Sequence, residues 1–160
     1  MATPEPLNIT LASDREVLIT RGFNAPRQLV FDAYTRPELL RRWLLGPPGW
    51  TFKVCEVDLR VGGSYRFEWS GPEGDLAMSG MYQELVPPER IVSKELFDRD
   101  WTGGETFSTL VLTEHNSKTT LENTIRYSSR EARDAALSTN MEVGMTASFN
   151  RLAELLLTLS

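Results

Sequence analysis

The amino-acid sequence predicts an α+β domain in which a curved seven-stranded antiparallel sheet wraps around a long C-terminal helix. Between residues 51 and 126, six strand-length segments alternate apolar and polar side chains and are separated by short turn sequences, which is typical of an antiparallel meander. Residues 140–159 instead carry apolar side chains at steps of three and four, as in an amphipathic helix. The sheet must bury at least one face, and this helix is the only large apolar element left to cover it.

The elements before the meander are shorter. Residues 1–14 contain prolines and small polar residues, so we expect a flexible tail or a short edge segment, with residues 15–160 forming one domain. The alternation in 16–23 predicts the first strand. Two short helices follow between the first and second strands, in "NAPRQLVFDAY" and "PELLRRWLL". Thr35 and Glu38 have the spacing of a capping box for the second helix, and "GPPG" ends it.

The region before the terminal helix permits two arrangements. Ser128 and Glu131 have the spacing of a capping box that opens a helix in "REARDAALS". Thr139 and Glu142 then either begin a separate helix or lie inside a kinked one. The sequence therefore leaves open whether the helix is continuous from residue 129 or broken near 139.

Composition narrows the functional classes. The chain has 160 residues, 41% hydrophobic and 24% charged, with a net charge of -5 and a pI near 5.0. These values are typical of one globular domain and argue against a surface built for nucleic acid or anionic lipid. A basic apolar leader and a run of 18 apolar residues are both missing, so we expect a cytoplasmic protein without membrane insertion.

No catalytic or metal-binding motif stands out. One cysteine, Cys55, and one histidine, His115, cannot form an internal disulfide or an ordinary Cys/His zinc site. The nucleophile elbow, P-loop, dinucleotide fingerprint and zincin motifs are missing, and His115 lies in a turn-like "EHNSK". We therefore predict no catalytic residue, metal or cofactor, with a metal site made of carboxylates alone as the open alternative. This favours a non-enzymatic function.

Four blocks carry a family resemblance: "APRQLVFDAYTRPELLRRWLLGP", "VDLRVGGSYRFEW", "GMYQELVPPERIV" and "GMTASFNRLAELL". Over residues 15 to 157 the chain resembles bacterial single-domain proteins named after the C-terminal part of the Hsp90 ATPase activator (AHSA1-type). These belong to the START-like, Bet v 1-like (SRPBCC) helix-grip superfamily. The resemblance implies a cavity between the curled sheet and the terminal helix, with the two short helices at its mouth.

Small residues in the terminal helix have two interpretations. Gly144, Ala147 and Ser148 interrupt its apolar face, although glycine inside a helix costs about 1 kcal/mol relative to alanine. If they face the sheet, the helix withdraws volume where the cavity is widest. Alternatively, Gly144 lets Trp69 or Tyr82 pack directly against the helix backbone.

The predicted inner face is rich in aromatic and thioether side chains. Such a lining suits a flat or chain-like apolar ligand, although each residue singly is also compatible with an ordinary core. Phe107 is assigned to the same face. The predicted apolar and small lining residues are Trp43, Trp50, Phe52, Val54, Tyr65, Phe67, Trp69, Met78, Gly80, Tyr82, Leu110, Leu112, Met141, Gly144, Met145, Ser148 and Phe149.

Two carboxylates are added to this set, because strand alternation brings them into register with apolar residues. Glu56 shares a face with Phe52, and Glu95 with Phe97. If buried, they would anchor a ligand hydroxyl or amine and have raised pKa values. Alternatively, such carboxylates pair with nearby arginines or lysines or lie in solvent. We favour this alternative for Asp58 and Glu84. For Glu56 and Glu95, the buried and the paired or exposed positions both stay open.

Three functions are compatible with the resemblance. The first is binding of a small hydrophobic molecule, lipid-, polyketide- or aromatic-like, in the cavity. The second is an enzyme of the cyclase or hydrolase type that uses an inward acid paired with Tyr65 or Tyr82. The third is a chaperone-associated or stress-response interaction module, although ATPase stimulation is not expected without the activators' additional N-terminal domain. A homodimer through a sheet edge or Trp101 is also compatible.

Overall fold

The structure is a computed structural model that describes residues 6–99 and 104–159, so Trp101 lies outside the described residues. Within them, eight strands and four helices follow one another along the chain. Their bounds are β1 Asn8–Leu11, β2 Glu16–Phe23, α1 Arg27–Thr35, α2 Pro37–Trp43, β3 Thr51–Val57, β4 Ser64–Gly71, β5 Gly74–Val86, β6 Arg90–Phe97, β7 Thr106–His115, β8 Lys118–Arg126, α3 Arg130–Leu137 and α4 Met141–Leu159.

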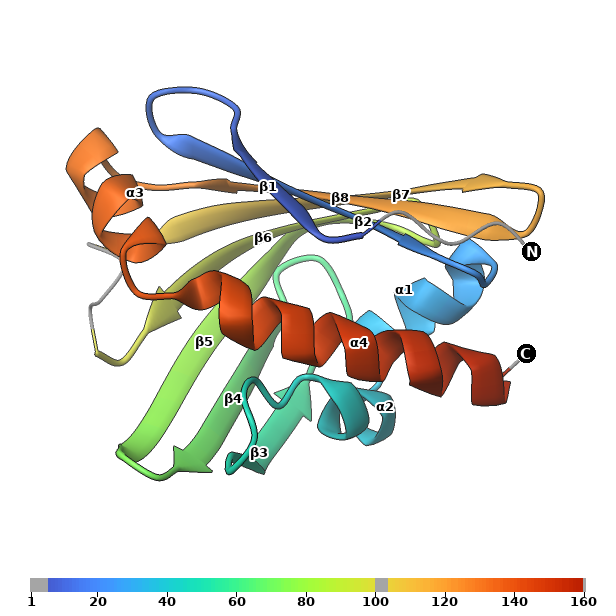
Figure 1. Cartoon of the computed structure of the whole chain (residues 1–160), viewed down its shortest axis with the longest axis horizontal. Helices are drawn as coiled ribbons and strands as arrows, with labels where there is room; N and C mark the ends of the chain where they lie inside the picture. Colours follow the sequence, from blue (N-terminus) through green and yellow to red (C-terminus); the bar gives the residue numbers. More distant parts are fainter. Residues whose placement is uncertain (1–5, 100–103, 160) are drawn as a thin grey trace.

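All strands join one antiparallel sheet in the order β1-β2-β8-β7-β6-β5-β4-β3. The sheet curls around α4, and α1 and α2 lie beside that helix (Figure 1). This confirms the α+β class with a large antiparallel sheet and a C-terminal helix. The count of seven strands was wrong, because Asn8–Leu11 pairs with β2 as an eighth, edge strand. Four residues are too few for a clear alternating pattern.

The helix boundaries differ from the predicted caps. α3 and α4 are separate helices, and Asn140 between them has a φ of 63°, so the terminal helix is not continuous. The N-cap of α3 is Ser129, whose hydroxyl accepts from Ala132 N at 3.0 Å, and not the predicted Ser128. Thr35 does not cap α2 either, because its hydroxyl donates to Phe31 O inside α1 at 2.8 Å.

The second half of α4 completes the hydrophobic core. Leu152, Leu155 and Leu156 are buried, whereas Leu157 on the opposite side is 63% exposed. This half of the helix therefore fills the space enclosed by the sheet, as its sequence period predicts. No helix of the described residues is long and apolar enough to cross a membrane.

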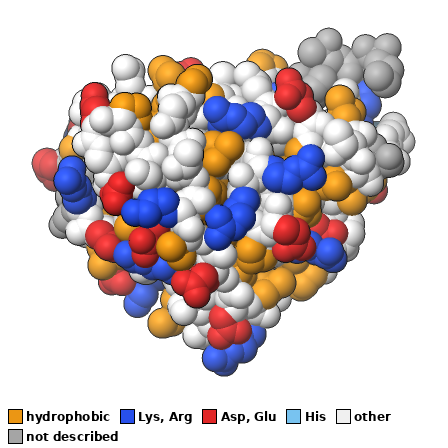
Figure 2. All heavy atoms as spheres, turned by 90° about the horizontal axis from the view of Figure 1, so that it is seen from below, with side chains coloured by type: hydrophobic (Ala, Val, Ile, Leu, Met, Phe, Trp, Pro, Cys, Tyr) orange, Lys and Arg blue, Asp and Glu red, His pale blue; other side chains and the backbone are white. Residues whose placement is uncertain are grey.

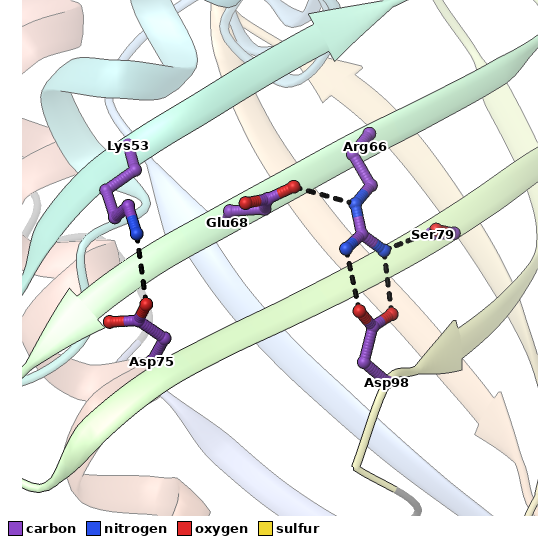
Figure 3. Close-up of polar contacts among 6 residues, drawn as sticks. All are labelled: Lys53, Arg66, Glu68, Asp75, Ser79 and Asp98. Atoms are coloured by element: carbon purple, nitrogen blue, oxygen red, sulfur yellow. Dashed lines mark hydrogen bonds and ion pairs between the residues drawn. The ribbon is translucent and has the colours of Figure 1, made fainter.

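The outer face of β3 to β5 carries a network of ion pairs. Arg66 donates to both carboxylate oxygens of Asp98 at 2.7 Å and to Glu68 at 3.1 Å, and Lys53 contacts Asp75 at 3.0 Å (Figure 3). Figure 2, which shows the molecule from below the view of Figure 1, also has basic and acidic side chains intermixed on its surface. Because β4 alternates, this outward network leaves the aromatic side chains of β4 on the inner face.

Candidate ligand cavity

A cavity of about 410 Å³ lies between the inner face of β4 to β8, the first half of α4 and the loop after α2. This volume is within the range of about 300–1,000 Å³ that small-molecule sites have. Most of the predicted lining residues border it: Trp43, Trp50, Tyr65, Phe67, Trp69, Met78, Tyr82, Glu95, Leu110, Met141, Gly144, Met145, Ser148 and Phe149.

The β3 residues of the predicted set do not border the cavity. A β-bulge between Phe52 and Val54 shifts the alternation, so that Cys55 is buried and Glu56 is exposed, opposite Arg66. The assignment of Glu56 to the inner face was therefore wrong. Val54 does not line the cavity either, and Phe52 lies behind its wall, with its ring 5.0 Å from that of Trp69.

Three further residues were misplaced. Leu112 is buried in the core beyond the cavity, and Gly80 lies in the wall beneath a tyrosine ring. Phe107 is 45% exposed on the outer face, because its neighbours Thr106 and Ser108 point into the cavity.

The structure also shows where the other two acidic residues, Asp58 and Glu84, lie. Asp58 forms an ion pair with Arg60 at 2.9 Å, and Glu84 with Arg90 at 3.1 Å. Pairing outside the cavity was the favoured interpretation for both residues, and it is confirmed. Glu95 is therefore the carboxylate that β6 brings into the cavity.

Tyr65 and Glu95 form the polar centre of the cavity. They lie on either side of Gly80 in one row across β4, β5 and β6. The Tyr65 ring crosses over Gly80, and its hydroxyl donates to Glu95 Oε2 at 2.5 Å. A Cβ at position 80 would lie 2.0 Å from Tyr65 Cζ, so only glycine leaves room for the ring.

The chain's four tyrosines all border the cavity and surround this carboxyl group. They are contributed by different segments: Tyr34 by α1, Tyr65 by β4, Tyr82 by β5 and Tyr127 by the residue after β8. Burial and then the charge of Glu95 raise the pKa of each, to about 12 for Tyr127. The phenols are therefore neutral hydrogen-bonding groups at physiological pH.

Burial also raises the pKa of Glu95, and the hydrogen bond from Tyr65 partly opposes this. A carboxyl group in this setting can accept hydrogen bonds, bind a cation or exchange a proton. By contrast, burial raises the pKa of the Cys55 thiol to about 11, which disfavours a nucleophilic thiolate. No group of three His, Cys, Asp or Glu side chains suited to a metal occurs among the residues described.

The small residues of α4 accommodate the loop between α2 and β3. A Cβ on Gly144 would lie 3.3 Å from Pro47 Cδ, and the Ser148 hydroxyl accepts from Gly46 N at 2.9 Å. Arg151 Nη1 donates to Gly46 O at 2.6 Å. Both interpretations of this helix face were therefore incomplete. Gly144 and Ser148 border the cavity, but the backbone they approach most closely is the loop at its mouth, not Trp69 or Tyr82.

Several lining residues were not anticipated. They are Tyr34, Leu40, Leu44, Leu45, Gly46, Pro47, Leu76, Ile91, Ser93, Phe97, Thr106, Ser108, Asn123, Ile125 and Tyr127. Alternation with Glu95 gave a usable signal for Ser93 and Phe97. No local pattern indicates that the loop after α2 lines the cavity, because its contacts with α4 join residues about a hundred positions apart in the chain.

Comparison with known proteins identifies the family of this chain. Residues 24–157 match the family described as activator of Hsp90 ATPase homolog 1-like protein. The chain belongs to this family. A comparison with curated proteins finds no significant match.

Solved structures of bacterial proteins share this activator-homolog-like fold. A crystal structure from Rhodobacter sphaeroides is 32% identical, with a TM-score of 0.90 over 96% of this chain and 99% of that one. One from Chromobacterium violaceum is 32% identical, with a TM-score of 0.74 over 88% and 96%. A solution structure from Staphylococcus epidermidis is 26% identical, with a TM-score of 0.80 over 96% and 95%. The fold is consistent with a ligand-binding or chaperone-associated module.

Proposed function

We propose that the protein binds a small hydrophobic molecule, lipid-, polyketide- or aromatic-like, in the cavity between the sheet and α4. The observation that carries this proposal is the cavity of about 410 Å³ itself, lined mostly by aromatic, aliphatic and thioether side chains. Natural cores are close-packed and leave few voids larger than a water molecule. A mostly apolar space of this size with a few convergent polar groups is the usual form of a ligand site.

A matched pair of tryptophan substitutions on α4 tests the proposal. Met145 borders the cavity, whereas Val143, two residues earlier, is 57% exposed. The neutral dye N-phenyl-1-naphthylamine, which brightens in apolar surroundings, serves as the probe. We expect wild type and Val143→Trp to bind it equally and Met145→Trp, which fills the cavity, to bind it at least about tenfold more weakly. Equal binding by all three proteins would contradict a site in the cavity.

Acid–base catalysis in the same cavity is a second candidate. The Tyr65–Glu95 pair favours it, because a half-buried carboxyl group with a raised pKa and a phenol donor beside it can take up and return a proton. A cyclisable polyketide-like substrate would be its natural target. Turnover should disappear in Glu95→Gln while substrate binding remains. Glu56→Gln, on the exposed outer face, is the matched control and should react like wild type.

Association with other proteins stays a prediction. The open sheet edges β1 and β3 are where a second copy could add strands, which size-exclusion chromatography with light scattering would detect. The family's description suggests a chaperone partner, which co-purification with Hsp90 would test. A cytoplasmic location also stays a prediction.

A further inference from the structure

Acidic and basic side chains are unequally represented in the described lining of the cavity. Among the described lining residues Glu95 is the one carboxylic acid, and none is a lysine, arginine or histidine. The basic side chains of the described structure that form ion pairs do so with other acids, such as Arg66 with Asp98 on the outer face. Among the described lining residues, a ligand therefore meets one acidic side chain and no basic one.

Glu95 has one hydrogen-bond donor but no counter-ion among the described residues. The donor is the Tyr65 hydroxyl, which contacts Oε2 at 2.5 Å, and no described cation lies within ion-pair distance of Glu95. Burying a carboxylate without a cationic partner is costly. A bound cation would remove this cost by supplying the missing opposite charge.

The surroundings of Glu95 also suit a cation. Tyr34, Tyr65, Tyr82 and Tyr127 border the same cavity, and the rings of Tyr65 and Tyr82 lie 5.0 Å apart. Aromatic faces carry partial negative charge and attract ammonium groups, and this attraction is stronger where water is excluded. An anionic headgroup would face a carboxylate and electron-rich rings, and no basic side chain of the described lining would offset them.

We propose that the cavity selects an apolar molecule that carries a protonated amine, with Glu95 as the counter-ion of the ammonium group. This inference rests on the proposed ligand-binding function and specifies its ligand class. The apolar body lies among the aromatic and methionine side chains, and the ammonium donates to the Glu95 carboxylate. The raised pKa of Glu95 agrees with this assignment, because burial of a carboxyl group without a cationic side chain beside it produces such a shift.

One biphenyl body with different headgroups tests the proposal. The probes are 4-phenylbenzylamine, 4-phenylbenzyl alcohol and 4-phenylbenzoate, titrated into the purified protein by isothermal calorimetry at neutral pH. Charge-assisted hydrogen bonds to buried groups are roughly twice as strong as neutral ones. We therefore expect the amine to bind at least about tenfold more tightly than the alcohol, and the benzoate most weakly.

Two variants test whether Glu95 causes the preference for the amine. In Glu95→Gln the amine should lose its advantage over the alcohol, whereas Glu56→Gln, outside the cavity, should keep it. The ranking in wild type needs no variant, so it stands even if Glu95→Gln folds poorly.

The results distinguish failure of the amine assignment from failure of the proposed ligand-binding function. Equal affinity for amine and alcohol, tightest binding of the benzoate, or an amine preference that survives Glu95→Gln would each overturn the amine assignment alone. If neither the three probes nor N-phenyl-1-naphthylamine binds, the proposed ligand-binding function fails as well.

Discussion

Replacing Gly80 by alanine should break the polar centre of the cavity. The new Cβ would lie 2.0 Å from Tyr65 Cζ and 2.4 Å from its hydroxyl oxygen, and the obstacle is a rigid ring rather than the end of a flexible chain. Ordinary contacts begin near 3.4 Å, so the ring and Cβ must separate by about 1.4 Å. Such a shift takes the hydroxyl away from Glu95 Oε2.

The cost has two parts. Over-packing in a well-filled wall costs about 1–3 kcal/mol. Losing a hydrogen bond to a charged group costs about 1.5–3 kcal/mol. We therefore expect Gly80→Ala to lower the free energy of unfolding by about 2.5–6 kcal/mol. In a chain of this length such a loss lowers Tm by roughly 5–20 °C.

Urea unfolding followed by circular dichroism measures this cost. The same substitution in a protein that lacks the Tyr65 ring identifies its cause. In a Tyr65→Ala protein the ring is gone, so adding Gly80→Ala should cost less than about 1 kcal/mol, because two residues in contact are energetically coupled. A Gly80→Ala protein within about 0.5 kcal/mol of wild type would refute the reasoning. So would an equal cost in both backgrounds.

Three further predictions concern the site and the core. Burial raises the pKa of Glu95, so its contribution to stability is present below the ordinary glutamate pKa and lost as pH rises through the raised value. Glu95→Gln should therefore gain stability over wild type in urea as pH rises above the ordinary glutamate pKa, and a pH-independent difference would contradict this. Ser148→Ala should cost about 1 kcal/mol and speed hydrogen exchange at Gly46 N, which loses its acceptor, and unchanged exchange would exclude this role. Leu152→Ala should cost about 2–5 kcal/mol by thermal unfolding, whereas the exposed control Leu157→Ala should stay within about 0.5 kcal/mol of wild type; equal costs would be incompatible with the burial.

The architecture was predictable because two periodicities dominate the sequence. Alternation in residues 51–126 and the three-to-four spacing in residues 140–159 each extend over many residues, and the observed sheet and α4 follow them. Short or local features were less predictable. Strand β1 has only four residues, and the cap of α3 fell one residue from its expected position, because Ser128 and Ser129 are chemically equivalent in the sequence.

The two carboxylates show why the site was harder to predict than the fold. Glu56 and Glu95 each alternate with a phenylalanine, so the sequence treats them alike. The bulge in β3 inserts one residue before Glu56, and one residue is enough to turn a side chain to the opposite face of a sheet. In β6 the pairing with β7 runs without a shift from Arg90 to Glu95, so the alternation holds there.

A glycine could have distinguished these carboxylates. Glycine inside a strand weakens it and commonly marks the close approach of another group. Gly80 stands in the middle of the long strand β5, and antiparallel pairing places it between Tyr65 and Glu95. A tyrosine across from such a glycine can extend over it toward the next strand, and the side chain it meets there is Glu95. The glycine in the strand, more than the alternation of the acids, therefore points to the carboxylate that the cavity uses.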